Sequence, residues 1–108
     1  MDKLSAVICS TFNQDIDYLL VFMRREINNC SNSNFKPIMV LVFERIEEEK
    51  AKYLKSMLDK DYTEDQFRIL INQEGKGFSS CLNYGILQMN VKYIFRLDTD
   101  DSSLQSRY

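Results

Sequence analysis

Short apolar runs alternate with amphipathic segments along the whole chain. Four of these runs are rich in β-branched and aromatic residues, which predicts strands; they lie at residues 4–11, 38–43, 67–71 and 93–97. The run at 38–43 is apolar at every position and follows Pro37, as expected for a strand that is buried on both faces of a sheet.

Apolar residues at helical spacing fill the segments between these runs. The predicted inward positions are 16, 19, 20, 23 and 27 in a first helix, Tyr53, Leu54, Met57 and Leu58 in a second helix at 47–59, and Phe78, Cys81, Leu82, Gly85, Ile86 and Met89 in a third. Gly85 lies on this apolar face although glycine costs about 1 kcal/mol inside a helix. We expect it to mark a close approach between the third helix and the sheet.

The resulting order, βαβαβαβ, predicts an α/β fold with a mainly parallel four-stranded sheet. Helices on both faces give a three-layer, Rossmann-like arrangement, and 108 residues suffice for a single domain, 1–108. In such sheets, ligands bind beyond the carboxyl ends of the strands. The polar residues expected to meet there are Thr11, Asn13, Glu44, the turn Gly75-Lys76-Gly77, Asp98 and Asp100.

Composition excludes several classes of function. The formal net charge of −2 leaves no basic surface, so we expect no nucleic-acid partner. The chain has no histidine, which excludes an imidazole base or zinc ligand. Its three cysteines show no metal-ligand spacing, and neither a signal peptide nor an apolar run long enough for a membrane span is evident. We therefore expect a cytoplasmic protein.

Three carboxylates follow the last predicted strand within four positions, at Asp98, Asp100 and Asp101. Side chains alternate along an extended backbone, so Asp98 and Asp100 are expected on the same side. Two carboxylates held together repel unless they share a cation, which indicates a metal site. The glycine-flanked Lys76 precedes a helix and could bind phosphate, but taken alone such a sequence is more often just a tight turn. Taken alone, Glu44 is expected to be a solvated carboxylate at the end of a strand.

Three stretches resemble the nucleotide-sugar-binding half of family-two glycosyltransferases. They are the helix G-F-S-S-C-L-N-Y-G-I at 77–86, the strand Y-I-F-R-L-D-T-D-D at 93–101 followed by Ser103 and Arg107, and the first strand exit S-T-F-N at 10–13. Family members carry G-L-x-x-A-L-N-x-G-I, then Y-I-x-R-x-D-x-D-D, and T-Y-N or S-Y-N at the first exit. The motifs occur here in the same order as in the family.

The resemblance implies the amino-terminal half of a GT-A fold that binds a nucleotide diphosphate sugar, with a UDP-sugar favoured. It implies that Asp98 faces the ribose or the metal and that Asp100 binds Mn²⁺ or Mg²⁺ between the two phosphates. The implied nucleotide-sugar-binding residues are Thr11, Phe12, Asn13, Glu44, Lys76, Gly77, Asn83 and Asp98, and the implied metal ligands are Asp98 and Asp100.

The chain departs from the family pattern at several points. The usual D-D-G-S exit of the second strand is Phe43-Glu44-Arg45-Ile46, an expected asparagine is Gly75, and an expected proline is Gln105. The acceptor-binding half, which supplies the catalytic base in inverting members, has no counterpart in these 108 residues. We therefore expect a truncated nucleotide-sugar-binding segment that has no catalytic residue of its own and is inactive in transfer when alone.

Two alternatives remain open from the sequence. Asp98-Thr99-Asp100-Asp101-Ser102 also suggests a phosphatase of the haloacid dehalogenase type, although that motif normally follows the first strand of its fold and here it follows the last. The chain could instead be a non-catalytic α/β interaction module. A sheet that stops after its fourth strand leaves an unprotected edge, which favours a homo-oligomer through that edge.

Overall fold

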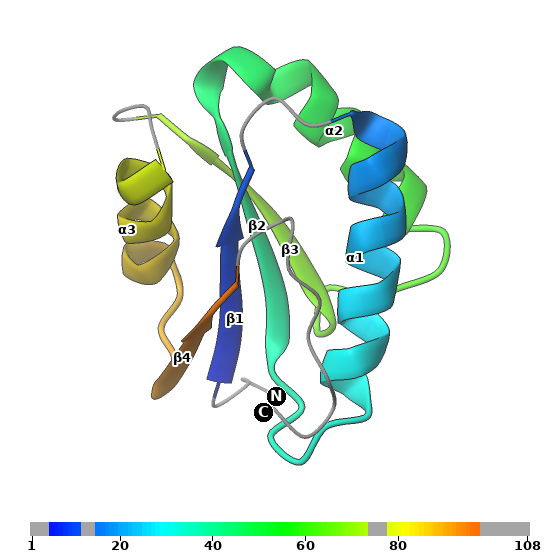
Figure 1. Cartoon of the computed structure of the whole chain (residues 1–108), viewed down its shortest axis with the longest axis vertical. Coiled ribbons are helices and arrows are strands. Elements are labelled where there is room, and N and C mark those ends of the chain that lie inside the picture. Colours follow the sequence, from blue (N-terminus) through cyan, green and yellow to red (C-terminus); the bar gives the residue numbers. More distant parts are fainter. Residues whose placement is uncertain (1–4, 12–14, 74–77, 98–108) are drawn as a thin grey trace.

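Four parallel strands form one sheet in the computed structural model, which describes residues 5–11, 15–73 and 78–97 (Figure 1). The strands are β1 (Ser5–Ser10), β2 (Ile38–Glu44), β3 (Phe67–Asn72) and β4 (Tyr93–Arg96). Their order across the sheet is β3-β2-β1-β4, and every neighbouring pair is parallel. The predicted α/β fold with a four-stranded parallel sheet is confirmed.

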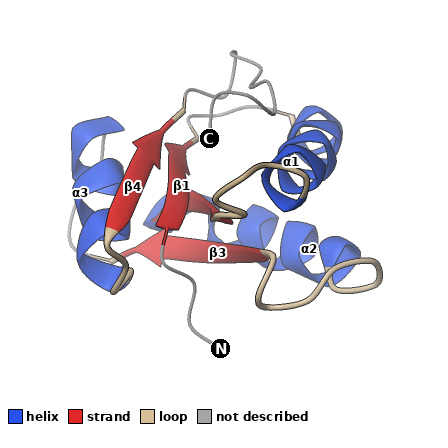
Figure 2. Cartoon of the chain, turned by 90° about the horizontal axis from the view of Figure 1, so that it is seen from below, coloured by secondary structure: helices blue, strands red, loops and turns tan. Residues whose placement is uncertain are grey.

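Helices cover both faces of this sheet. Helices α1 (Ile16–Ser31) and α2 (Glu48–Leu58) lie on one face, and α3 (Phe78–Gln88) lies on the other (Figures 1 and 2). A short 3-10 turn, η1 (Arg45–Glu47), connects β2 to α2. None of the helices in the described ranges is both long and apolar enough to cross a membrane.

Alternation along the two inner strands divides the core into two clusters. Val7, Cys9 and the odd-numbered residues of β2 pack against α1 and α2, whereas Ala6, Ile8 and the even-numbered residues 38–42 pack against α3. Every residue of 38–43 is thereby buried, which is why this run contains no polar residue.

The predicted inward positions whose side chains the structure describes are largely confirmed, but one is wrong, and two buried residues of α1, Phe22 and Glu26, were not predicted. Leu19, Met23 and Ile27 are fully buried on α1. On α2, however, Tyr53 is 53% exposed, so its predicted inward position is wrong. The buried stripe of α2 is instead Ala51, Leu54 and Leu58, spaced i, i+3, i+7. Tyr53 precedes Leu54 by one position, or about 100° of helix rotation, which carries its ring past the edge of the contact with the sheet.

Gly85 lies where α3 comes closest to the sheet, as predicted. A Cβ atom at this position would lie 2.9 Å from Ile8 Cγ2 and 2.9 Å from Val42 Cγ2. Both methyl groups belong to β-branched residues of the central strands, which have little freedom to move. The absence of a side chain at Gly85 therefore sets the distance between α3 and the sheet.

Candidate functional site

Polar residues occupy the carboxyl ends of three adjacent strands. Ser10 ends β1, Glu44 ends β2 and Asn72 ends β3; Ser10 is in register with Val42, and Glu44 is in register with Asn72. Thr11 continues the line, since its backbone N–H donates to Val42 O at 3.2 Å. The structure therefore brings together two of the predicted site residues, Thr11 and Glu44, along one edge of the sheet.

The order of the strands reverses between β1 and β4. From β1 the chain builds outward through β2 and β3, and then returns to place β4 on the other side of β1. This is the topological switch point, where ligands of open α/β sheets bind. Thr11 follows β1 at this point, and Leu97 follows β4, with its N–H donating to Ile8 O at 3.1 Å. The two strand exits that flank the switch point are the ones that lead into S-T-F-N and D-T-D-D.

The remaining predicted site residues are not brought to this edge by the described part of the structure. Asn83 is exposed on α3, two residues beyond the buried Cys81 and directly after the buried Leu82, so it lies away from the face that contacts the sheet. The other predictions lie outside the described residues and stay predictions: Phe12, Asn13, Lys76, Gly77, Asp98 and Asp100.

A buried polar layer lies between the carboxyl edge and the first turns of α3. Asn72 is 1% exposed, and its Nδ2 atom donates to Ser80 Oγ at 2.9 Å and to Cys81 Sγ at 3.7 Å. Ser10 and Glu44 point to the same side of the sheet, because they alternate with Ile8 and Val42, which pack against α3. The amide of Asn72 thus ties the end of β3 to α3.

The Cys81 thiol lies beside this layer, within hydrogen-bonding distance of Asn72. Burial raises the pKa of the Cys81 thiol above its ordinary value, and the carboxylates of Glu44 and Glu47 raise it further, against an opposing effect of the hydrogen bond from Asn72. A thiol with a raised pKa is a poor nucleophile and a poor metal ligand. Cys81, which is 1% exposed, packs in the core cluster between α3 and the sheet.

The Ser10 hydroxyl is the unusual member of this layer. Ser10 is 3% exposed, and its Oγ atom has no hydrogen-bond partner among the residues that the structure describes. Native proteins rarely leave a buried hydroxyl unpaired without a water, ion or ligand to satisfy it. Ser10 thus supplies an unused hydrogen-bonding group near the switch point.

Replacing Ser10 with alanine should raise the free energy of unfolding of the ligand-free protein by about 1 kcal/mol, because it removes a buried hydroxyl that has no partner among the described residues. The matched control is Ser33→Ala. Ser33 is also buried, but its Oγ donates to Cys30 O at 2.8 Å and accepts from Lys36 N at 3.2 Å. This second substitution should lower the free energy of unfolding by about 1 kcal/mol. Urea denaturation of both variants measures the contrast, and equal losses would contradict the unpaired state of Ser10.

Metal ligands are not grouped in the described part of the chain. Within residues 5–11, 15–73 and 78–97, no cluster of three or more cysteine, aspartate or glutamate side chains could hold a metal ion. Glu44 is a described carboxylate at the carboxyl end of β2. The predicted ligands Asp98 and Asp100 lie outside the described residues, one and three positions after Leu97 in the sequence.

No model of a known protein family matches the chain, and no curated protein matches it either. The resemblance to family-two glycosyltransferases therefore depends on the motifs at 10–13, 77–86 and 93–101 alone.

Sequence reasoning missed Ser10 and Asn72 as buried polar residues, because each lies where an apolar run gives way to a polar loop. A signal was nevertheless available. Side chains two positions apart in a strand lie on the same face. Ser10 falls two positions after Ile8 and Asn72 two positions after Leu70, so this spacing extends each strand to include the polar residue.

Proposed function

We propose that this chain is the nucleotide-sugar-binding half of a family-two glycosyltransferase with a GT-A fold. One structural observation carries the proposal. The two motifs that resemble the family, S-T-F-N and D-T-D-D, follow the two strands that flank the topological switch point, β1 and β4. This point is where an α/β sheet of this order binds its ligand. The resemblance in sequence and the topology of the sheet thus point to the same edge.

The side chains at this edge suit a nucleoside diphosphate. Glu44 offers a carboxylate that accepts hydrogen bonds from N–H groups of a base, and the buried Ser10 hydroxyl is available as a donor or acceptor. Asp98 and Asp100 are hard oxygen ligands of the kind that Mn²⁺ and Mg²⁺ prefer. A cation held by them would neutralise charge on the diphosphate leaving group.

The proposal assigns donor binding and no catalytic base to this chain. It includes a cytoplasmic location, which is supported by the three buried cysteines, none of which forms a disulfide within the described residues. The acceptor belongs to the acceptor-binding half of the parent enzyme.

Isothermal titration calorimetry with UDP, in the presence and absence of Mn²⁺, tests this proposal. We expect saturable binding of UDP that Mn²⁺ strengthens by at least about tenfold, or 1.4 kcal/mol. ADP and GDP are the competing nucleotides, and preference for one of them would change the base but keep the site. The Asp65→Asn variant is the matched control, because Asp65 is an exposed carboxylate that precedes β3 at its amino end. Absence of heat with every nucleotide at millimolar concentration in the presence of Mn²⁺ would refute the proposal.

A further inference from the structure

Strand β3 is an edge strand of the sheet, and some of its backbone groups have no partner within the described ranges. Its register with β2 pairs Leu41 with Ile69 and Phe43 with Ile71, and Met39 N donates to Gln66 O at 3.0 Å. In a parallel ladder with this register, the backbone groups of alternate residues face the neighbour, so those of Ile69 and Ile71 face away from β2. Nothing in the described part of the chain pairs with them.

The side chains along this edge are more apolar than an isolated edge strand tolerates. Ile69, Leu70 and Ile71 are all only half-buried, and Phe67, Ile69 and Ile71 lie on the face that carries α1 and α2. Native proteins normally protect an open edge by charges, a proline, a bulge or a covering segment. On β3, Arg68 is the one charged residue of the strand.

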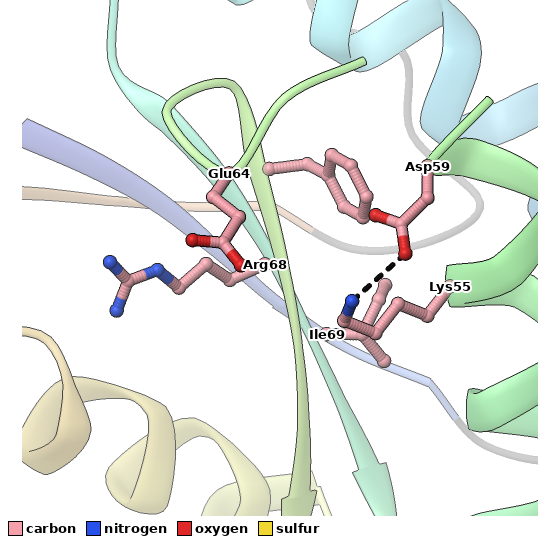
Figure 3. Close-up of a pocket in the computed structure, with 6 residues that line it drawn as sticks. Lys55, Asp59, Glu64, Arg68 and Ile69 are labelled. Carbon is pink, nitrogen blue, oxygen red and sulfur yellow. Dashed lines mark hydrogen bonds and ion pairs between the residues drawn. The ribbon is translucent and has the colours of Figure 1, made fainter. Parts of the chain in front are cut away.

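A pocket of about 370 Å³ lies against this edge, lined by Lys55, Asp59, Glu64, Phe67, Arg68 and Ile69. Figure 3 shows Glu64 and Arg68 on one side of β3 and the Lys55–Asp59 ion pair of 2.9 Å on the other. The pocket lies toward the amino end of β3, away from the polar carboxyl edge. Its acids and bases are balanced, which suits a partner surface with both signs of charge.

Strand β4, at the other edge of the sheet, is less suited to pairing with a strand of another chain. Strand β4 pairs over four residues only, and both its first and last residues, Tyr93 and Arg96, are exposed. The longer and more apolar edge is β3.

We propose that β3 pairs antiparallel with β3 of a second copy of this chain, across a two-fold axis at Ile69. Antiparallel pairing requires residues whose backbone groups face outward to oppose one another. The register that meets this condition symmetrically places Ile69 opposite the partner's Ile69 and Phe67 opposite the partner's Ile71. The apolar stripe of one copy then covers that of the other, and the two sheets become continuous.

The charges of α2 fit the same symmetry. Lys55 and Asp59 lie on the side of α2 that lines the pocket at the β3 edge. A two-fold axis at the edge brings the two α2 helices side by side and antiparallel, so that Lys55 lies close to the partner's Asp59. The same symmetry repeats this contact, and the edge is therefore complementary to itself in charge as well as in backbone pairing.

Sedimentation velocity on the wild type and on two charge variants tests the interface. The wild type should show a monomer–dimer equilibrium in the micromolar range. Lys55→Glu and Asp59→Lys should each weaken self-association by at least about tenfold, because like charges then face each other twice across the axis. An equimolar mixture of the two variants should regain dimers, because each new charge then faces an opposite one. This recovery cannot result from altered folding of either variant.

Two further measurements complete the test. Lys52→Glu, at a 68% exposed position on the same helix, also removes an i,i+4 pair but should leave self-association unchanged. In hydrogen exchange, the amides of Ile69 and Ile71 should become protected only at concentrations that give dimers, whereas the amide of Leu70, which faces β2, should be protected at all concentrations. A wild type that stays monomeric up to about 1 mM overturns the inference. So does a dimer that leaves the amides of Ile69 and Ile71 unprotected, or a variant mixture that fails to associate.

Discussion

Replacing Gly85 with alanine should lower the free energy of unfolding by about 1 kcal/mol, although alanine is the better helix former. An added Cβ would lie 2.9 Å from a methyl group of Ile8 and 2.9 Å from one of Val42, closer than carbon atoms approach in proteins. Overpacking of this kind costs about 1–3 kcal/mol, and the gain in helix propensity returns about 1 kcal/mol. Urea denaturation followed by circular dichroism, at a fixed protein concentration, measures the difference.

Asn83→Ala is the matched control for Gly85→Ala, since Asn83 is exposed on the same helix. That substitution gains helix propensity without a clash and should raise the free energy of unfolding by about 0.5 kcal/mol. The Gly85→Leu variant should be less stable than Gly85→Ala, because a longer side chain has to displace both strands. A Gly85→Ala variant that is as stable as the wild type would show that α3 can move away from the sheet at little cost.

The fold could be predicted because the strongest signals in the sequence are local ones. The apolar run at 38–43 is too short for a helix and too continuous for a half-exposed strand. It therefore predicts a strand that is buried on both faces. The spacing of Cys81, Leu82 and Gly85 likewise gave both a helix and its contact with the sheet.

The errors arose where tertiary packing decides which part of a helix is covered. Tyr53 is apolar enough to belong to the core, but α2 is buried only along the line of Ala51, Leu54 and Leu58. On α1, Phe22 and Glu26 are buried although the predicted face contained neither. Glu26 has no exposed side-chain surface and accepts from Arg25 Nε at 3.2 Å, and hydrophobic periodicity does not foresee a buried carboxylate.

The order of the strands could not be predicted from the sequence either, and it is the feature that matters most for the proposed function. A βαβαβαβ pattern predicts parallel strands but does not say which of them is central. Because β1 lies between β2 and β4, the exits of the first and last strands become neighbours, although the residues that end them, Ser10 and Arg96, are far apart in the chain. Because β1 and β4 are adjacent, the two motifs that follow them can be considered as one candidate site.

Replacing Asp100 with asparagine should abolish the strengthening of UDP binding by Mn²⁺, a loss of at least about tenfold, and leave the weaker metal-free binding unchanged. Asparagine keeps the size of the side chain but removes the charge that a hard cation requires. Asp98→Asn should weaken UDP binding both with and without Mn²⁺, because its expected place is on the ribose side as well as near the metal. Calorimetry of both variants, with Asp65→Asn as the exposed control, separates the two roles. An Asp100→Asn variant that retains the full effect of Mn²⁺ would remove the metal from this site, and with it the main chemical reason for two carboxylates at the exit of β4.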